Sequence, residues 1–157
     1  MAKLEPGESR YEALVDAVVC TLSASCGMTP ERVRDCEAPS QINGIVGMIS
    51  VLGDVHWSVM LAMPRETACA ISQAFAGFEI DYDSEDMGDL VGEIANVLAG
   101  DVLLRLERLG VHADMSLPAV MRGTAMGVML PDQKPLLVSC FNSSLGPFEL
   151  VLGARAE

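Results

Sequence analysis

The residues from Ser84 to Pro118 constrain the fold of this chain more than any other stretch. Ser84 is a favourable N-cap, the acidic residues directly after it suit the positive end of a helix, and Gly110 stands where a glycine ends one. These signals predict a single long helix from about Glu85 to Leu109. A helix of that length buries one face against other elements, so we expect the chain to be organised around it.

A narrow polar stripe runs along this predicted helix. At about 100° per residue, spacings of four, three and four residues place side chains on one face. Four residues follow one another at those spacings: Asp89, Glu93, Asn96 and Gly100. The stripe presents a carboxylate and a carboxamide one turn apart. It is either a solvated face with two ordinary polar residues or a functional pair, and the pattern by itself favours the solvated face.

The remainder of the helix is apolar or small. One arc is expected to be buried and contains Leu90, Val91, Ile94, Val97, Leu98, Val102 and Leu104. A third face carries residues without bulk at helical spacing, namely Gly88, Gly92, Ala95 and Ala99. Small residues let another backbone approach closely, so the sequence predicts a packing partner along this face.

Length and composition limit the class of protein. The 157 residues suit one domain, with residues 1–8 as a short disordered leader and residues 9–157 as the domain. No apolar run reaches the roughly 18 residues of a membrane span, and no signal peptide is visible, so we expect a cytoplasmic protein without membrane association. The five cysteines lack a C-x-x-C pair and are expected to be free thiols. A net charge of −12 argues against nucleic acid as a partner.

The order of predicted elements gives the fold class. Ser9 and Glu12 form a capping box for a first helix that ends at Gly27, and at most one short strand follows, around residues 32–36. The later elements are a doubly buried strand at 42–52, a strand at 55–63, a helix at 65–75, the central helix, and four strands in an antiparallel meander at 111–117, 119–130, 136–142 and 148–154. This is an α+β fold with an antiparallel sheet, built from a helix-plus-three-strands unit used twice with one helix inserted between the copies, and with long helices packed on one face.

Outside the central helix, the sequence offers little candidate chemistry. His56 and His112 are isolated on predicted strands with no second ligand at a metal-binding spacing, so each is expected to be an ordinary strand residue. The chain has no nucleophile elbow, phosphate loop or dinucleotide-binding fingerprint. We therefore expect no metal or cofactor of its own.

The spacing of the polar stripe resembles a known signature. Asp89, three residues, Glu93, two residues, Asn96, 21 residues and Pro118 match the CheC/CheX/FliY family of response-regulator phosphatases. The segments GEIANVLAGDV and SLPAVMRG are most similar to CheX. The resemblance also includes the hairpin and helix in GDVHWSVMLAMPRETACAISQAFAG and covers about residues 44–123.

Two departures from the wider family narrow the expectation. CheC-type members carry the Glu and Asn pair on both duplicated helices, whereas the places matched here on the first helix hold Ala13, Ala17 and Cys20. One site is therefore expected, as in CheX. The sequence ends soon after its last strand, without the additional switch domain of FliY-type proteins, which disfavours a rotor component.

The resemblance implies a phosphatase that removes the phosphoryl group from the aspartate of a CheY-like receiver domain. Asn96 would hold the attacking water, and Glu93 would pair with the receiver lysine. Asp89, Gly92, Gly100 and Pro118 would support the site: Asp89 caps or positions, the glycines leave room for the partner, and Pro118 shapes the turn beneath the helix. Magnesium would belong to the receiver domain.

A homodimer is also implied, with the strand at 42–52 as a candidate for burial across it. The alternative is a module of the same fold that binds a receiver domain without hydrolysis.

Overall fold

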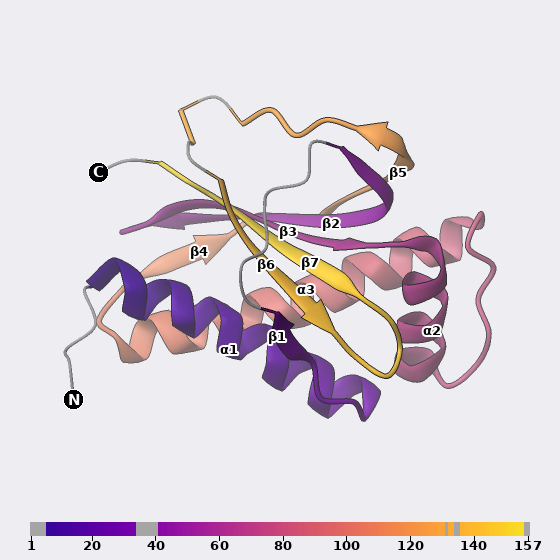
Figure 1. Cartoon of the computed structure of the whole chain (residues 1–157). Coiled ribbons are helices and arrows are strands. Elements are labelled where there is room, and N and C mark those ends of the chain that lie inside the picture. The colour runs from indigo at the N-terminus through magenta and orange to yellow at the C-terminus, as the bar shows by residue number, and fades with distance from the viewer. Residues whose placement is uncertain (1–5, 34–40, 131, 134–135, 156–157) are drawn as a thin grey trace.

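The computed structural model describes residues 6–33, 41–130, 132–133 and 136–155, which form three helices and seven strands. Their order is α1 (Pro6–Cys26), β1 (Glu31–Val33), β2 (Ile42–Gly53), β3 (His56–Met63), α2 (Arg65–Ala76), α3 (Glu85–Arg108), β4 (Ala113–Met115), β5 (Ala119–Met126), β6 (Leu136–Asn142) and β7 (Phe148–Ala154). All helices lie on one side of a single sheet, as Figure 1 shows. The α+β class and the helices packed on one face are thereby confirmed.

The sheet is antiparallel throughout and has the strand order β1-β6-β7-β3-β2-β4, with β5 also paired to β2. The two halves of the chain contribute equivalent strands: β1 corresponds to β4 and β5, β2 to β6, and β3 to β7. When each strand is replaced by its counterpart, the same strand order is obtained, read from the other edge of the sheet. The helices obey the same relation, because α1 and α3 lie beside one another beneath the sheet and run in opposite directions (Figure 1). The duplicated unit predicted from the element order is therefore present as a pseudo-twofold arrangement, with α2 as the insertion.

The predicted four-strand meander is wrong for its first two strands. β4 and β5 do not pair with each other, because both lie along the outer edge of β2, whereas β6 and β7 do form a hairpin. The reason is length: β2 has 12 residues, so its one edge has room for β4 at residues 51–53 and for β5 at residues 42–48. β2 is thus paired on both sides within its own chain, and its burial requires no second copy. The role of this strand in a dimer interface stays a prediction.

Helix α3 begins and ends as its sequence predicts. The Ser84 hydroxyl accepts a hydrogen bond from the Met87 amide at 3.3 Å and so caps the first turn. At the other end, Gly110 has a φ of 77°, its amide donates to Glu107 O, and the Val111 amide donates to Leu106 O, both at 2.9 Å. This pair of bonds is a Schellman motif, which satisfies carbonyl groups that the end of a helix leaves open.

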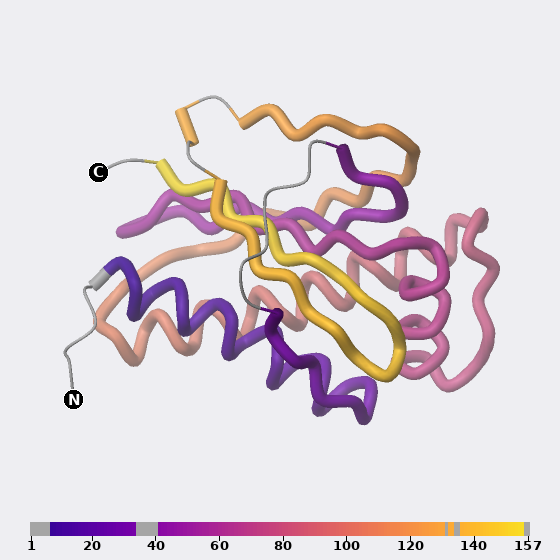
Figure 2. Tube along the Cα trace, viewed as in Figure 1, coloured from indigo at the N-terminus to yellow at the C-terminus, as the bar shows by residue number. Residues whose placement is uncertain are grey.

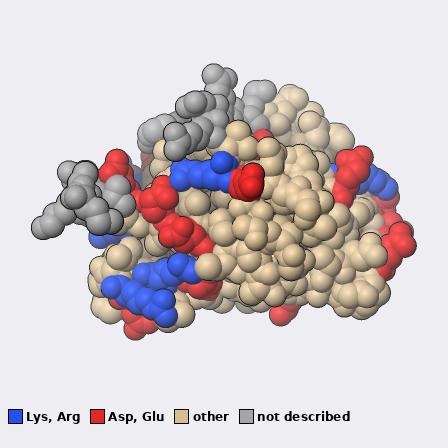
Figure 3. Space-filling view, turned by 60° about the horizontal axis from the view of Figure 1, so that its bottom comes forward, with Lys and Arg blue, Asp and Glu red and all other residues tan. Residues whose placement is uncertain are grey.

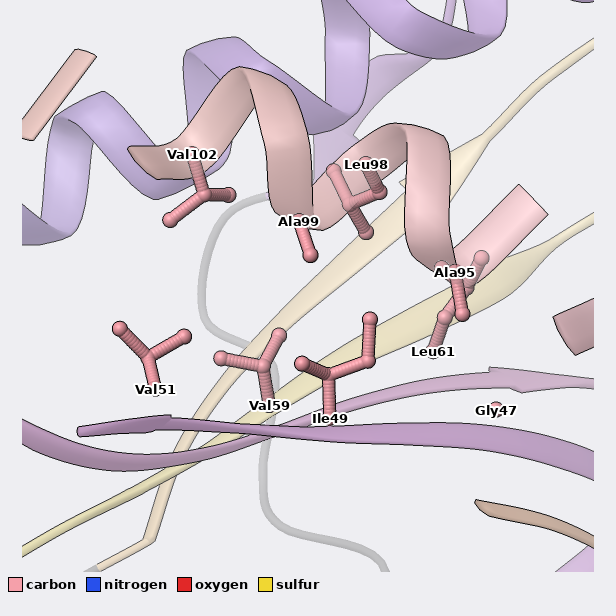
Figure 4. Close-up of a pocket in the computed structure, with 9 residues that line it drawn as sticks. All are labelled: Gly47, Ile49, Val51, Val59, Leu61, Ala95, Leu98, Ala99 and Val102. Atoms are coloured by element: carbon pink, nitrogen blue, oxygen red, sulfur yellow. The ribbon is translucent and has the colours of Figure 1, made fainter. Parts of the chain in front are cut away.

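The inner face of α3 packs on β2 and β3. Ala95, Leu98, Ala99 and Val102 point from the helix toward Gly47, Ile49, Val51, Val59 and Leu61 of the sheet, as Figure 4 shows. The space left between these apolar side chains is only about 10 Å³, so it is a gap in core packing rather than a ligand site. Two members of the predicted buried arc lie elsewhere, because Val97 and Leu104 are 42% and 47% exposed on the outer face.

The other face of the sheet carries a second apolar cluster, made of Ile42, Val46, Met60, Ala62 and Val151. After β5 the chain turns back across this face (Figure 2), and Met126, Val128 and Leu130 pack against the cluster. Both faces of β2 are therefore covered, which accounts for its nearly continuous apolar sequence.

Three local predictions need correction. Helix α1 begins at Pro6, three residues before the predicted capping box, because the turn containing Glu8 and Ser9 is already helical; residues 1–5 of the predicted leader lie outside the described residues. The short strand is Glu31–Val33, and the rest of its predicted range also lies outside them. Cys140 is disulfide-bonded, so the expectation that all five cysteines are free thiols is wrong, whereas Cys20, Cys26 and Cys69 are free.

Among the described residues, no helix combines the length and apolar character that a bilayer span requires.

Candidate functional site

The polar stripe lies on the outer face of α3, away from the sheet. Asp89, Glu93 and Gly100 are exposed and Asn96 is half-buried. Most of the residues between them are buried, but Val97 is exposed. Within the described part of the chain, the side chains of Glu93 and Asn96 make no hydrogen bond or ion pair. A carboxylate and a carboxamide one turn apart are therefore both available to a partner.

The surroundings of the stripe are open along the helix. A Cβ built on Gly88 or Gly100 would meet no atom within 4 Å. At Gly92 the situation differs, because a Cβ would lie 3.7 Å from Pro118 Cγ and 3.7 Å from Val120 Cγ2. The fold thus brings Pro118 against the helix one residue before Glu93, although 24 residues separate them in the chain. The sheet therefore approaches Gly92 and Ala95 of the small face predicted on α3, whereas Gly88 faces open space.

The first turn of α3 is anchored to β5 by one arginine. Arg122 donates from Nη1 to the carbonyl oxygens of Tyr82 and Ser84 at 2.8 and 3.1 Å, and from Nη2 to that of Asp83 at 3.3 Å. The guanidinium group of Arg65 lies over the Tyr82 ring at 4.6 Å from its centroid. Sequence reasoning missed this anchor, because nothing in the local pattern around Arg122 indicates contacts about 40 residues away.

The pseudo-twofold relation identifies the counterparts of the stripe on α1. Six consecutive buried positions of the two helices match when their numbers differ by 77: Leu14, Val15, Ala17, Val18, Thr21 and Leu22 against Val91, Gly92, Ile94, Ala95, Leu98 and Ala99. Asp16 then corresponds to Glu93 and Val19 to Asn96. The matching places predicted from sequence were therefore wrong, since Ala17 is fully buried and cannot correspond to an exposed glutamate. The first helix still lacks the amide, because Val19 occupies its place.

Charge on the helical side of the molecule is divided into small groups. Figure 3 shows the Lys and Arg side chains there in a few clusters beside acidic ones, with a broad uncharged area between the ends. The acidic residues Glu85 and Asp86 lie at the start of α3 and the basic residues Arg105 and Arg108 at its end, as the helix dipole favours. Among the described residues that this view shows, the basic side chains do not form one continuous field. Among the described residues, no group of three or more His, Cys, Asp or Glu could hold a metal ion.

Comparison with known proteins identifies the family. Residues 45–142 match the profile of the chemotaxis phosphatase CheX family. The chain belongs to the CheX family. A curated member, the CheY-P phosphatase CheX of Thermotoga maritima, is 29% identical over 117 residues, which cover 71% of this chain and 74% of that protein.

Solved structures share the fold. The crystal structure of a chemotaxis protein CheX from Desulfovibrio desulfuricans has a TM-score of 0.82 at 19% identity and matches 93% of this chain and 99% of its own. The CheX chain of a CheX-CheY-BeF3-Mg2+ complex from Borrelia burgdorferi has a TM-score of 0.74 at 21% identity, with 94% and 98% covered. These CheX-family similarities agree with the pseudo-twofold sheet and the paired long helices described above.

Proposed function

We propose that this CheX-family chain hydrolyses the aspartyl phosphate of a CheY-like receiver domain, with Asn96 and Glu93 as its acting residues. The observation that carries the proposal is their placement one turn apart on an exposed helix face, where neither has a partner within the described chain. The relative named as a CheY-P phosphatase and the solved CheX-CheY complex support the choice of partner.

In this proposal Asn96 needs only to orient the attacking water. An acyl phosphate is already activated, so a catalyst needs only to hold a water in line with the phosphorus while the receiver's own magnesium and lysine neutralise charge. Water attacks the phosphorus, the bond from phosphorus to the aspartate oxygen breaks, and phosphate leaves the restored carboxylate. A carboxamide can accept from and donate to that water without titrating. Asn96 is half-buried, so its amide lies closer to the helix surface than the exposed Glu93 carboxylate does.

Glu93 has a different role in the proposal. Its exposed carboxylate projects one turn before Asn96 and would accept a charge-assisted hydrogen bond from the receiver lysine, which fixes the docking angle. Asp89, one turn earlier, adds negative charge at the same end of the helix. Gly100 leaves the following turn open, and Pro118 supports the helix at Gly92.

The direct test is phosphate release from a panel of phosphorylated receiver domains, with and without the purified chain. Hydrolysis above the receiver's own rate supports the proposal. The alternative of a non-catalytic receiver-binding module would give binding to the beryllofluoride-activated receiver with no increase in phosphate release. The presence of both Glu93 and Asn96 favours the phosphatase.

Location and assembly are also proposed here. We place the protein in the cytoplasm, where receiver domains act, and propose a homodimer by analogy with the CheX resemblance. Light scattering should then give twice the chain mass of 16.7 kDa, and a monomer at micromolar concentration would contradict the dimer.

A further inference from the structure

The segment that joins β4 to β5 contains a one-residue bulge. Both strands follow the same edge of β2, with Val51 opposite Met115 and Met48 opposite Ala119. The three residue steps from Val51 to Met48 along β2 therefore lie opposite four residue steps from Met115 to Ala119. The extra residue falls within 116–118, where Pro118 has no amide hydrogen to continue the ladder. Bulges of this kind turn a side chain out of the regular alternation and are frequent beside functional sites.

The bulge is held firmly on both sides. The Ser116 amide donates to Ser50 O at 2.9 Å, the Ser50 amide donates to Ser116 Oγ at 3.0 Å, and Ser116 Oγ donates to Leu117 O at 3.0 Å. On the other side, Pro118 rests against α3 at Gly92. Leu117 therefore lies on a backbone that Ser116 fixes to the sheet and that Pro118 fixes to α3 at Gly92, the residue before Glu93.

This rigidly held leucine faces solvent. Leu117 is 89% exposed, more than any other large apolar side chain in the described residues. A second exposed apolar residue, Val97, follows Asn96 on α3 and lies one turn after Glu93. Exposed apolar side chains thus occur next to Asn96 on the helix, at Val97, and next to Pro118 on the bulge, at Leu117.

We propose that Leu117 and Val97 form an apolar contact surface that seats the receiver domain beside its phosphorylated aspartate. The inference rests on the proposed function. A receiver whose aspartyl phosphate reaches Asn96 must cover the adjoining turns of α3, and it therefore meets the bulge that touches this helix. Apolar contacts that surround a polar pair exclude bulk water from it, and this strengthens the polar interactions that the pair makes. The partner surface is accordingly apolar where it faces Leu117.

The experiment compares Leu117→Ala, Leu117→Asp and Val97→Ala with the wild-type chain. Steady-state hydrolysis of a phosphorylated receiver gives kcat and KM, and titration with the beryllofluoride-activated receiver gives Kd. The matched control is Met129→Ala, because Met129 is 85% exposed but lies between Val128 and Leu130, which pack against the apolar cluster on the opposite face of the sheet. Melting temperatures show whether each variant is folded.

A docking role predicts a particular division between the two kinetic constants. Leu117→Ala and Val97→Ala should each raise KM and Kd several-fold, and Leu117→Asp should raise them about tenfold or more, since each tenfold step corresponds to about 1.4 kcal/mol. Because neither side chain touches the reacting atoms, kcat at saturation should stay within about twofold of wild type. Met129→Ala should change neither constant.

Each contrary result has a separate meaning. If the wild-type chain hydrolyses a receiver phosphate and the Leu117 variants keep its KM and Kd, the contact surface is refuted while the phosphatase function stands. A fall in kcat with unchanged KM would also refute docking, as would an equal effect of Met129→Ala. If the wild-type chain neither binds nor hydrolyses any receiver, the proposed function fails, and the inference fails with it.

Discussion

The Pro118 ring packs on α3 at Gly92, where a Cβ would lie 3.7 Å from Pro118 Cγ. That distance is an ordinary van der Waals contact, so the glycine is not required to prevent a clash at this point. The contact instead holds the segment that carries Pro118 against α3, one residue before Glu93. Glu93 and Pro118, two residues of the sequence signature that are 25 positions apart, therefore belong to one structural unit.

Closer packing occurs one layer deeper, at Gly47. A Cβ there would lie 3.1 Å from Val91 Cγ1 and 3.4 Å from Ala95 Cβ. Gly47→Val should lower the free energy of unfolding by about 1 to 3 kcal/mol, because the stiff, buried valine on α3 cannot move aside. Urea unfolding measures the change. Gly88→Ala is the control, since its Cβ meets open space, and it should stabilise the chain by up to about 1 kcal/mol.

Replacing Asn96 separates binding from chemistry. Asn96→Ala should still bind the activated receiver, while stimulated hydrolysis should fall by orders of magnitude, because the lost interaction exists mainly in the transition state. Single-turnover phosphate release and receiver titration give the two quantities. Asn142→Ala, which removes an exposed amide on β6, should leave both unchanged. An Asn96→Ala variant with full activity would refute the mechanism.

Replacing Glu93 should affect docking as well as turnover. Glu93→Ala should weaken receiver binding by about 1.5 to 3 kcal/mol, the usual value of a charge-assisted hydrogen bond. Its melting temperature should barely move, because the position is exposed and alanine favours helix. Asp16→Ala is a close control: Asp16 is also exposed and holds the corresponding position on α1. Equal loss of binding in both variants would indicate a general charge effect instead of a specific contact.

The sequence predicts the positions of the helices and strands well, but it predicts poorly which strands pair with each other. Caps and glycines determine where α3 starts and stops, so Ser84 and Gly110 were sufficient to place it. The edge of β2, by contrast, is shared by two strands, and strand patterning does not say which strand pairs with which. The apolar side chains of Val97 and Leu104 predict burial, yet both are exposed, because apolar residues are common on protein surfaces. The stripe itself followed from helical spacing, whereas the bulge at Leu117 depends on register and was not foreseen.

The proposal that the chain has no metal of its own gives a simple thermal test. Chelation of the purified protein with excess EDTA should leave its melting temperature unchanged, because a structural ion would contribute binding free energy to folding and its removal would lower stability. The described residues contain no acidic, His and Cys group that could hold such an ion. A drop of several degrees would show that a structural ion is present.

Glu149 should make stability depend on pH in an unusual direction. It lies half-buried on β7, and this burial raises the pKa of its carboxyl above the ordinary value of 4.5. The folded state then holds the proton more tightly than the unfolded state does. The stabilisation that results is fully present below the unfolded pKa and is lost as pH rises through the folded pKa. At pH 7 the charged carboxylate is therefore a cost to the folded protein.

Glu149→Gln keeps the shape of the side chain and removes its charge at every pH. The variant should consequently be more stable than wild type at pH 7, and the difference should shrink as pH falls toward 4.5. Urea unfolding at the two pH values measures it. Glu107→Gln, at an exposed position on α3, is the control for the removal of a surface carboxylate. If Glu149→Gln were instead less stable at pH 7, the carboxylate would have to be stabilised by a positive partner, and burial would not be the dominant influence on its pKa.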